Sequence, residues 1–186
     1  IPFITVSALG GVTNELENVY ETAQDGGFED AIAALNTILG SHRRIVDEHV
    51  KRQNYLFTTS FKELCGQARA ALRRVLSIRK EGVPIDPDQS VRAELVATGE
   101  LLSGLVLKTL LDTRGYSTFL LHGNGFMLGA VTNEKPLYTN AVFLREQSRS
   151  NLLTILEEDQ IVITQAAVGS INMGKRLIMT PGFVGS

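Results

Sequence analysis

The sequence predicts an α/β protein whose sheet is largely parallel and covered by helices on both faces. The chain opens with a β-branched and aromatic run at residues 1–6, which is typical of a strand. Long segments with apolar residues at helical spacing follow. A nearly continuous apolar run at 101–111 then precedes a second strand pattern at 118–121. A buried helix that joins two strands in this way indicates a βαβ unit with parallel strands.

The first helix is expected to begin near Thr13, because its hydroxyl is placed to cap the amides of the first turn and acidic residues follow it. Gly26 and Gly27 predict its end. Two further helical patterns follow at residues 28–51 and about 60–80. Together they form a mainly helical excursion at about 28–82 beside the sheet.

Two prolines break the helical pattern at 83–87, because proline disfavours helix at the residue before it. Asp88 is placed to cap the next helix. That helix contains the apolar run at 101–111 and should be buried on most of its faces, with a pause predicted at Gly99. Gly115 then offers a left-handed cap at its end.

The remaining elements are a weakly patterned stretch at 123–140, a helix at about 143–157, and strands at 161–164 and 176–179. The segment 169–175 contains glycines and a lysine, but a nucleotide-binding phosphate loop needs Ser or Thr after the lysine and then a helix. Arg176 and a strand pattern follow instead. A hairpin turn at 172–174 explains the segment better.

The composition limits the class of partner. The 18 basic and 20 acidic residues leave a formal net charge of −2, which gives no electrostatic reason to expect a nucleic acid or an anionic membrane. The apolar runs stop short of the roughly 20 residues that a membrane span needs. The single cysteine, Cys65, cannot form an internal disulfide, and we expect it to be a small buried side chain. These features fit a cytoplasmic enzyme or binding module for a small polar metabolite.

The first candidate ligand site is the turn at 7–14, between the first strand and the first helix. Gly10 and Gly11 allow the backbone to approach a ligand, and amides at a helix start attract a carboxylate or a phosphate. Ser7 and Thr13 add hydroxyl groups. A tight turn with a capping threonine explains the same residues without a ligand, so the residues alone leave both interpretations open.

Glu100 is the second candidate, because this carboxylate leads directly into the apolar run. Burial of an unpaired carboxylate is costly. We therefore expect Glu100 to face a cationic side chain, backbone donors or the ammonium group of a ligand. A structural ion pair is an equally physical alternative.

The histidines give weaker signals. His42 and His49 are seven residues apart and would share one helix face, but the charged residues between them indicate a solvated surface, and spacing places no third metal ligand. His122 ends a strand, a position at which α/β folds place ligand contacts, although an ordinary loop histidine is the simpler explanation. We therefore expect no metal site.

Three motifs together resemble those of the aspartate kinases, in the amino-acid-kinase family. That family has a strand ending in Ser-Ala-x-x-Gly-x-Thr-Asn, and residues 7–14 read Ser-Ala-Leu-Gly-Gly-Val-Thr-Asn. A Gly-Glu-x-x-Ser element that leads into an apolar helix is matched at 99–103. Residues 181–186, Pro-Gly-Phe-Val-Gly-Ser, resemble the Gly-Phe-Ile-Gly element that precedes the nucleotide-side loop of the family. The resemblance covers most of the chain.

The resemblance implies one partial amino-acid-kinase catalytic domain over residues 1–186. The residues implied for the aspartate site are Ser7, Gly10, Gly11, Thr13 and Glu100. The glutamate would face the substrate ammonium group, while hydroxyls and turn amides would hold its carboxylate oxygens. The implied reaction is ATP-dependent phosphorylation of the aspartate β-carboxylate, the first step towards lysine, threonine and methionine. ATP and Mg²⁺ are the implied cofactors, and a cytoplasmic homo-oligomer is implied as well.

The chain also departs from the family. It starts after the Lys-Phe-Gly-Gly-Thr-Ser motif, which meets the phosphates, and stops before the Gly-Arg-Gly-Gly-Ser-Asp loop. His122 stands where the family tends to have aspartate, residues 123–136 match poorly, and the segment 161–174 is longer than the family pattern. We therefore expect the chain to be a fragment that has no kinase activity by itself.

Two other functions fit these residues. The chain could belong to a non-catalytic amino-acid-binding or scaffolding relative that kept the substrate pocket and lost the nucleotide side. It could also belong to a kinase of the same fold that acts on another acidic metabolite, such as acetylglutamate or glutamate. The match at 7–14 argues against the second of these.

Overall fold

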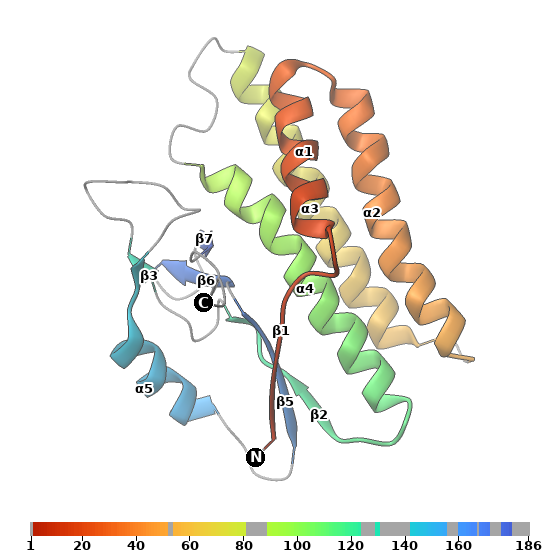
Figure 1. The fold of residues 1–186 in the computed structure, drawn as a ribbon, viewed down its shortest axis with the longest axis vertical. Helices are drawn as coiled ribbons and strands as arrows, with labels where there is room; N and C mark the ends of the chain where they lie inside the picture. Colours follow the sequence, from red (N-terminus) through yellow and green to blue (C-terminus); the bar gives the residue numbers. More distant parts are fainter. Residues whose placement is uncertain are drawn as a thin grey trace.

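A computed structural model shows a layer of long helices packed on one face of a small sheet (Figure 1). It describes residues 2–51, 54–80, 89–123, 129–130, 142–155, 160–166, 168–171 and 176–179. The predictions for Asp88, the proline break at 83–87, the hairpin turn at 172–174 and residues 181–186 lie outside this part of the chain, as does most of the stretch at 123–140.

The central sheet is parallel, as predicted. Its strands are β1 (Phe3–Val6), β5 (Ile161–Gln165) and β2 (Thr118–Leu120), in the order β1-β5-β2. Val6 lies beside Gln165 and Leu120 beside Ile163. Because the middle strand comes last in the sequence, the two strands joined through the helices are not neighbours. All three strands still point the same way.

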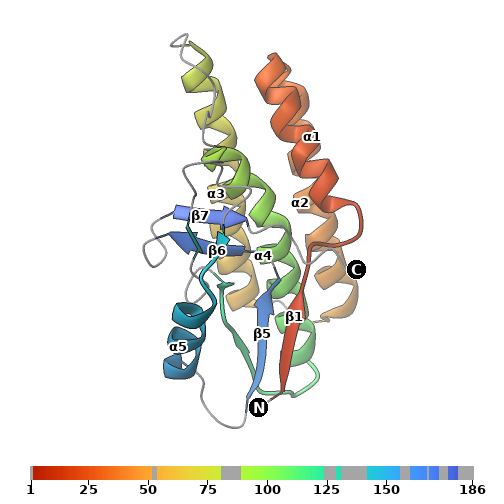
Figure 2. The ribbon, with the colours of Figure 1, turned by 60° about the vertical axis from the view of Figure 1, so that its left-hand side comes forward.

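Helices cover both faces of this sheet, so the predicted class is confirmed. The helical layer on one face consists of α1 (Val12–Asp25), α2 (Phe28–His49), α3 (Tyr55–Lys80) and α4 (Ser90–Asp112). On the other face lies α5 (Arg145–Ile155), whose Leu152 and Ile155 pack against Leu121 and Val162. Figure 1 shows α4 and α5 on opposite sides of the strands, and Figure 2 shows the strands of the sheet turned towards the viewer.

Two antiparallel pairs complete the described strands. One joins β3 (Gly129–Ala130) to β4 (Val142–Phe143), and the other joins β6 (Val168–Ile171) to β7 (Arg176–Met179). Ile171 pairs with Arg176 at the end of this second pair, and β6 itself was not expected from the sequence. The predicted helix at 143–157 begins later, at Arg145, because Val142 and Phe143 pair as β4.

The start of α1 corrects the prediction for Thr13. The N-cap residue is Gly11, with φ +85°, and no side chain caps the helix. Gly11 adopts a left-handed conformation that an L side chain rarely takes, so the turn closes through the backbone, with Val12 N donating to Leu9 O over 3.0 Å. Thr13 is exposed in the first turn. The predicted end is confirmed, because Gly26 is the left-handed C-cap.

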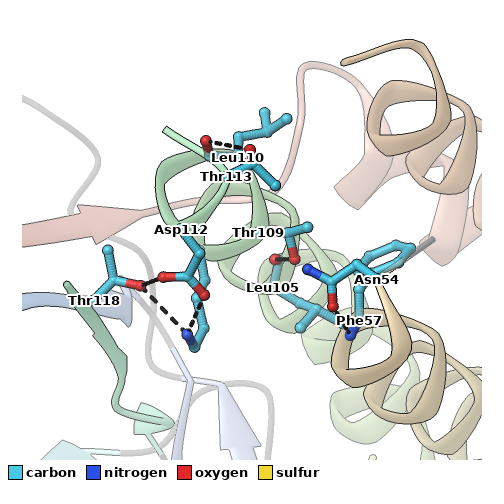
Figure 3. A network of polar contacts seen from close by, with 9 residues as sticks. Asn54, Phe57, Leu105, Thr109, Leu110, Asp112, Thr113 and Thr118 are labelled. Carbon is cyan, nitrogen blue, oxygen red and sulfur yellow. Dashed lines mark hydrogen bonds and ion pairs between the residues drawn. The ribbon is translucent and has the colours of Figure 1, made fainter. Parts of the chain in front are cut away.

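Helix α3 begins five residues earlier than the predicted start near Ser60. Asn54 explains the difference, because its Oδ1 accepts a hydrogen bond of 2.9 Å from the amide of Phe57, as Figure 3 shows. An asparagine side chain that satisfies an amide of the first turn is a strong helix-start signal. Tyr55 and Leu56 follow it as exposed side chains, and the apolar pattern therefore did not reveal this first turn.

Helix α4 is buried on most of its faces, as predicted, but it continues through Gly99 without a pause. A Cβ at Gly99 would lie 3.0 Å from Val12 Cγ1, 3.1 Å from Ala8 Cβ and 3.2 Å from Leu16 Cδ1. The glycine therefore serves close packing of α4 against the turn before α1 and against α1 itself.

Replacement of Gly99 by alanine is expected to lower the free energy of unfolding by roughly 1–3 kcal/mol, because the added methyl group overpacks this contact. Urea unfolding of the chain measures the change. Gly40→Ala in α2 is the matched control, since nothing lies within 4 Å of a Cβ at that position. The control should gain up to about 1 kcal/mol from helix propensity. An equal gain in both variants would contradict the close-packing argument.

The end of α4 is tied to the start of β2 by side chains. Asp112 accepts hydrogen bonds from Lys108 Nζ, over 2.5 Å, and from Thr118 Oγ1 (Figure 3). Gly115 takes φ +85° between them, the left-handed conformation predicted for it. This short connection makes α4 the crossover that leads back to the sheet.

His42 corrects a second prediction, because it lies in the core of the helical layer and not on a solvated surface. Its side chain is 0% exposed, and its Nδ1 donates to Ile38 O over 2.9 Å. It continues the buried stripe of α2 formed by Leu35, Leu39 and Val46. His49 is exposed on the same helix. Cys65 is buried, as predicted.

Burial lowers the pKa of His42, while its hydrogen bond to Ile38 and the nearby carboxylate of Glu15 act in the opposite direction. The unfolded chain therefore binds this proton more readily than the folded chain. Stability should be full above the ordinary histidine pKa of 6.5 and should fall as the pH drops below it. Urea unfolding between pH 7.5 and 5 should show this loss, and His42→Leu should reduce it. His49→Gln is the control, and an unchanged pH dependence in His42→Leu would contradict the assignment.

Candidate functional site

The candidate site lies where the three parallel strands end. Ser7 follows β1, His122 and Gly123 come after β2, and Ala166 follows β5. Because the strands run in one direction, these positions meet at one edge of the sheet, which is where open α/β sheets bind ligands. Ala166 N donates to Val6 O over 2.9 Å, and this bond extends the pairing of β5 with β1 to the edge itself.

Ser7 and Glu100 are brought together at this edge, although 93 residues separate them in the sequence. Ser7 Oγ donates to Glu100 Oε1 over 3.4 Å, at the long end of the hydrogen-bond range. Glu100 is 5% exposed on α4, whereas Ser7 is exposed. Gly99, the preceding residue, is the close-packing point of α4 on this turn. The arrangement presents a largely buried carboxylate beside an accessible hydroxyl.

The glycine turn lies next to this contact, because Ala8 and Val12 on either side of it pack against Gly99. Gly10 and Gly11 are exposed, and a Cβ at Gly10 would meet nothing within 4 Å. The first hydrogen bond of α1 runs from Glu15 N to Gly11 O, so the amides of the preceding helical residues lie at the positive end of the helix. Thr13 lies on the exposed side of this first turn, and its hydroxyl has no capping role.

Gln165 is a residue at this edge that the sequence analysis missed. It ends β5, is 1% exposed, and accepts a hydrogen bond of 2.7 Å from Gly123 N through its Oε1. A Cβ at Gly104 would lie 2.8 Å from its Nε2, so α4 passes directly over the amide one turn after Glu100. The available signal was a polar residue at the end of an apolar strand.

His122 does not join Ser7 and Glu100 in the described contacts. It borders a groove of about 190 Å³ between α3 and α4, lined by Ser60, Glu63, Leu64, Gln67, Leu101, Leu105 and His122. His122 is exposed on one side, while the neighbouring protein removes enough water from the imidazole to lower its pKa. The polar side chains of the groove come mainly from one helix, α3.

The described residues bring no three His, Cys, Asp or Glu side chains together as a metal site. His42 lies in the core of the helical layer and His49 lies on the surface, so the two histidines do not form a shared site. In the same part of the chain, no helix is long and apolar enough to cross a membrane.

Comparison with known proteins supports the fold. No protein-family model and no curated protein matches the sequence. Among solved structures, E. coli aspartokinase III in complex with aspartate and ADP matches 96% of the chain, with a TM-score of 0.72 and 20% identity. The same enzyme in complex with lysine and aspartate matches 100% of the chain, with a TM-score of 0.72 and 23% identity.

Clostridium acetobutylicum aspartate kinase matches 97% of the chain, with a TM-score of 0.62 and 14% identity. The chain spans 36%, 38% and 35% of the lengths of these three matched chains, or just over a third. Identities this low establish architecture alone. The chain has an aspartokinase-like fold over part of such a domain.

Proposed function

We propose that this chain is part of the catalytic domain of an aspartate kinase, a cytoplasmic, homo-oligomeric phosphotransferase that uses ATP to phosphorylate the β-carboxylate of aspartate. The product would feed the synthesis of lysine, threonine and methionine. The contact between Ser7 and Glu100 at the carboxyl edge of an aspartokinase-like sheet carries the proposal. An acidic amino acid presents an ammonium group and two carboxylates, and this edge offers a carboxylate, hydroxyls and the amides of a helix start.

In this proposal Glu100 binds the ammonium group of aspartate. The glutamate is almost fully buried, so solvent screens its charge poorly and its attraction to a cation is stronger than on the surface. Ser7 orients the glutamate carboxylate and can turn its hydroxyl towards a substrate oxygen. Gly10 and Gly11 let the substrate reach the turn amides, and Thr13 adds a hydroxyl at the start of α1.

The reaction breaks the bond between the γ-phosphorus of ATP and the bridging oxygen and forms a bond from a β-carboxylate oxygen of aspartate to that phosphorus, with ADP leaving. The residues above would bind and orient the acceptor, which is the main demand of such transfers. Magnesium would be bound mainly by the ATP phosphates and water, because proteins usually supply only one or two carboxylates to this ion. We assign it no ligand among the described residues.

The test is acyl phosphate formation by the full-length protein that contains this chain, trapped with hydroxylamine. Aspartate, glutamate and acetylglutamate are supplied as separate acceptors with ATP and Mg²⁺. The proposal expects product with aspartate alone. Product only with another acceptor would assign the reaction to that metabolite. No product, with aspartate still bound in calorimetry, would indicate a non-catalytic amino-acid-binding relative.

A further inference from the structure

Gln165 contacts three of the elements that meet at the candidate site. Its backbone pairs with Val6 at the end of β1, directly before Ser7. Its side-chain oxygen accepts the Gly123 amide hydrogen, just beyond β2, over 2.7 Å. Its side-chain nitrogen lies under Gly104 on α4, one turn from Glu100. Through its backbone and its side chain together, this one buried residue links the two outer strands and α4 at the edge where the ligand is proposed to bind.

The amide is an expensive group to bury at this position. Gln165 is 1% exposed, and its Nε2 has no hydrogen-bond partner among the described residues. A buried donor without a partner is unfavourable, whereas an apolar side chain of similar length, such as methionine, would avoid this cost. Packing alone therefore does not require glutamine. The glutamine amide supplies an oxygen that accepts the hydrogen bond from Gly123 N, and methionine has no such acceptor.

Gly104 fits the same interpretation. A Cβ there would lie 2.8 Å from Gln165 Nε2 and 3.1 Å from Leu120 Cδ1. The amide cannot simply swing away, because its oxygen is held by Gly123. The absence of a side chain at position 104 therefore lets α4 lie close to the sheet while the amide stays in place.

We propose that Gln165 is a positioning residue of this site, which holds the backbone after β2 at a fixed place relative to Ser7 and Glu100. This inference rests on the proposed function for its ligand, an acidic amino acid. Gln165 need not touch that ligand. It acts through Gly123 and through the spacing between α4 and the sheet.

Four variants of the full-length protein that contains this chain test the proposal. Gln165→Met removes the acceptor at nearly constant length, and Gln165→Glu keeps an oxygen that Gly123 can reach. Gly104→Ala displaces the amide without removing it. Thr164→Val is the matched control, because Thr164 is equally buried on the same strand but faces away from α4. Two readouts are used: hydrogen exchange of the Gly123 amide and the dissociation constant for aspartate from calorimetry.

Gln165→Met and Gly104→Ala should both speed exchange at Gly123 and raise the dissociation constant by about tenfold, the effect of one lost hydrogen bond. Gln165→Glu should keep the amide protected, and Thr164→Val should change neither readout. A protected Gly123 in Gln165→Met, or an equal loss in Thr164→Val, would overturn the proposal. If the unsubstituted full-length protein does not bind aspartate, the proposed function fails, and exchange at Gly123 alone decides the role of Gln165.

Discussion

Replacing Glu100 with alanine is expected to lower aspartate-dependent acyl phosphate formation by the full-length protein by roughly 100-fold or more. The reason is that loss of one partner from a buried charge pair costs about 3–5 kcal/mol. Here the ammonium group of aspartate would be left without its counter-charge at a position that is 5% exposed. The measurement is the initial rate of hydroxamate formation over a range of aspartate concentrations.

Two further variants sharpen this result. Glu100→Gln keeps the size and hydrogen-bonding oxygen but removes the charge, so it should lose most of the activity as well. Glu94→Gln is the control on the same helix, where the carboxylate pairs with Arg74 at the surface. A surface pair contributes at most about 1 kcal/mol, so activity should change little. Full activity in Glu100→Ala, with unfolding unchanged, would remove Glu100 from the site.

Replacement of Leu102 by alanine is expected to lower the free energy of unfolding by about 2–5 kcal/mol, the usual cost of a large-to-small change in a packed core. Leu102 is 0% exposed on α4, the helix that packs against both the helical layer and the sheet. A loss of this size is a large fraction of the roughly 5–15 kcal/mol that stabilises an ordinary domain. Urea unfolding monitored by circular dichroism gives the change.

The control for this change is Leu153→Ala in α5. Leu153 is 66% exposed, so its truncation should stay within about 0.5 kcal/mol of the unsubstituted chain. A similar small effect in Leu102→Ala would mean that the region around α4 collapses to fill the space, or that this helix contributes less to the core than its burial indicates.

Most of the fold could be predicted from short-range sequence patterns. The left-handed glycines at Gly26 and Gly115 and the apolar run of α4 are each specified by a few neighbouring residues, and the structure has them where expected. Threonine is a common helix cap, which explains the prediction for Thr13. The left-handed backbone conformation of Gly11, which actually starts α1, has no signal in the side-chain pattern. His42 was hidden by its charged neighbours, although its spacing from Leu35 and Leu39 matches one buried helix face.

The site was less predictable, because its contacts join distant parts of the chain. The side-chain chemistry of Ser7 and Glu100 marks each of them as a candidate. From the sequence, only the resemblance to the aspartate kinases predicts that the two belong to one site. The bond from Gly123 to Gln165 spans 42 residues and has no local pattern. The sequence does not explain the glycine at position 104 either, because the reason for it is the close approach of Gln165 and Leu120, at the ends of two strands.

The strand order β1-β5-β2 also constrains how the protein folds while it is being synthesised. Phe3 pairs with Val162, so the first strand emerges from the ribosome long before its only described partner strand. The helices α1 to α4 contact one another over shorter separations and can associate in the meantime, since local contacts form sooner than distant ones. Until β5 is synthesised, the edges of β1 and β2 that will pair with it are open to pairing with other chains, so β5 completes the sheet and closes the edges through which misassembly could start.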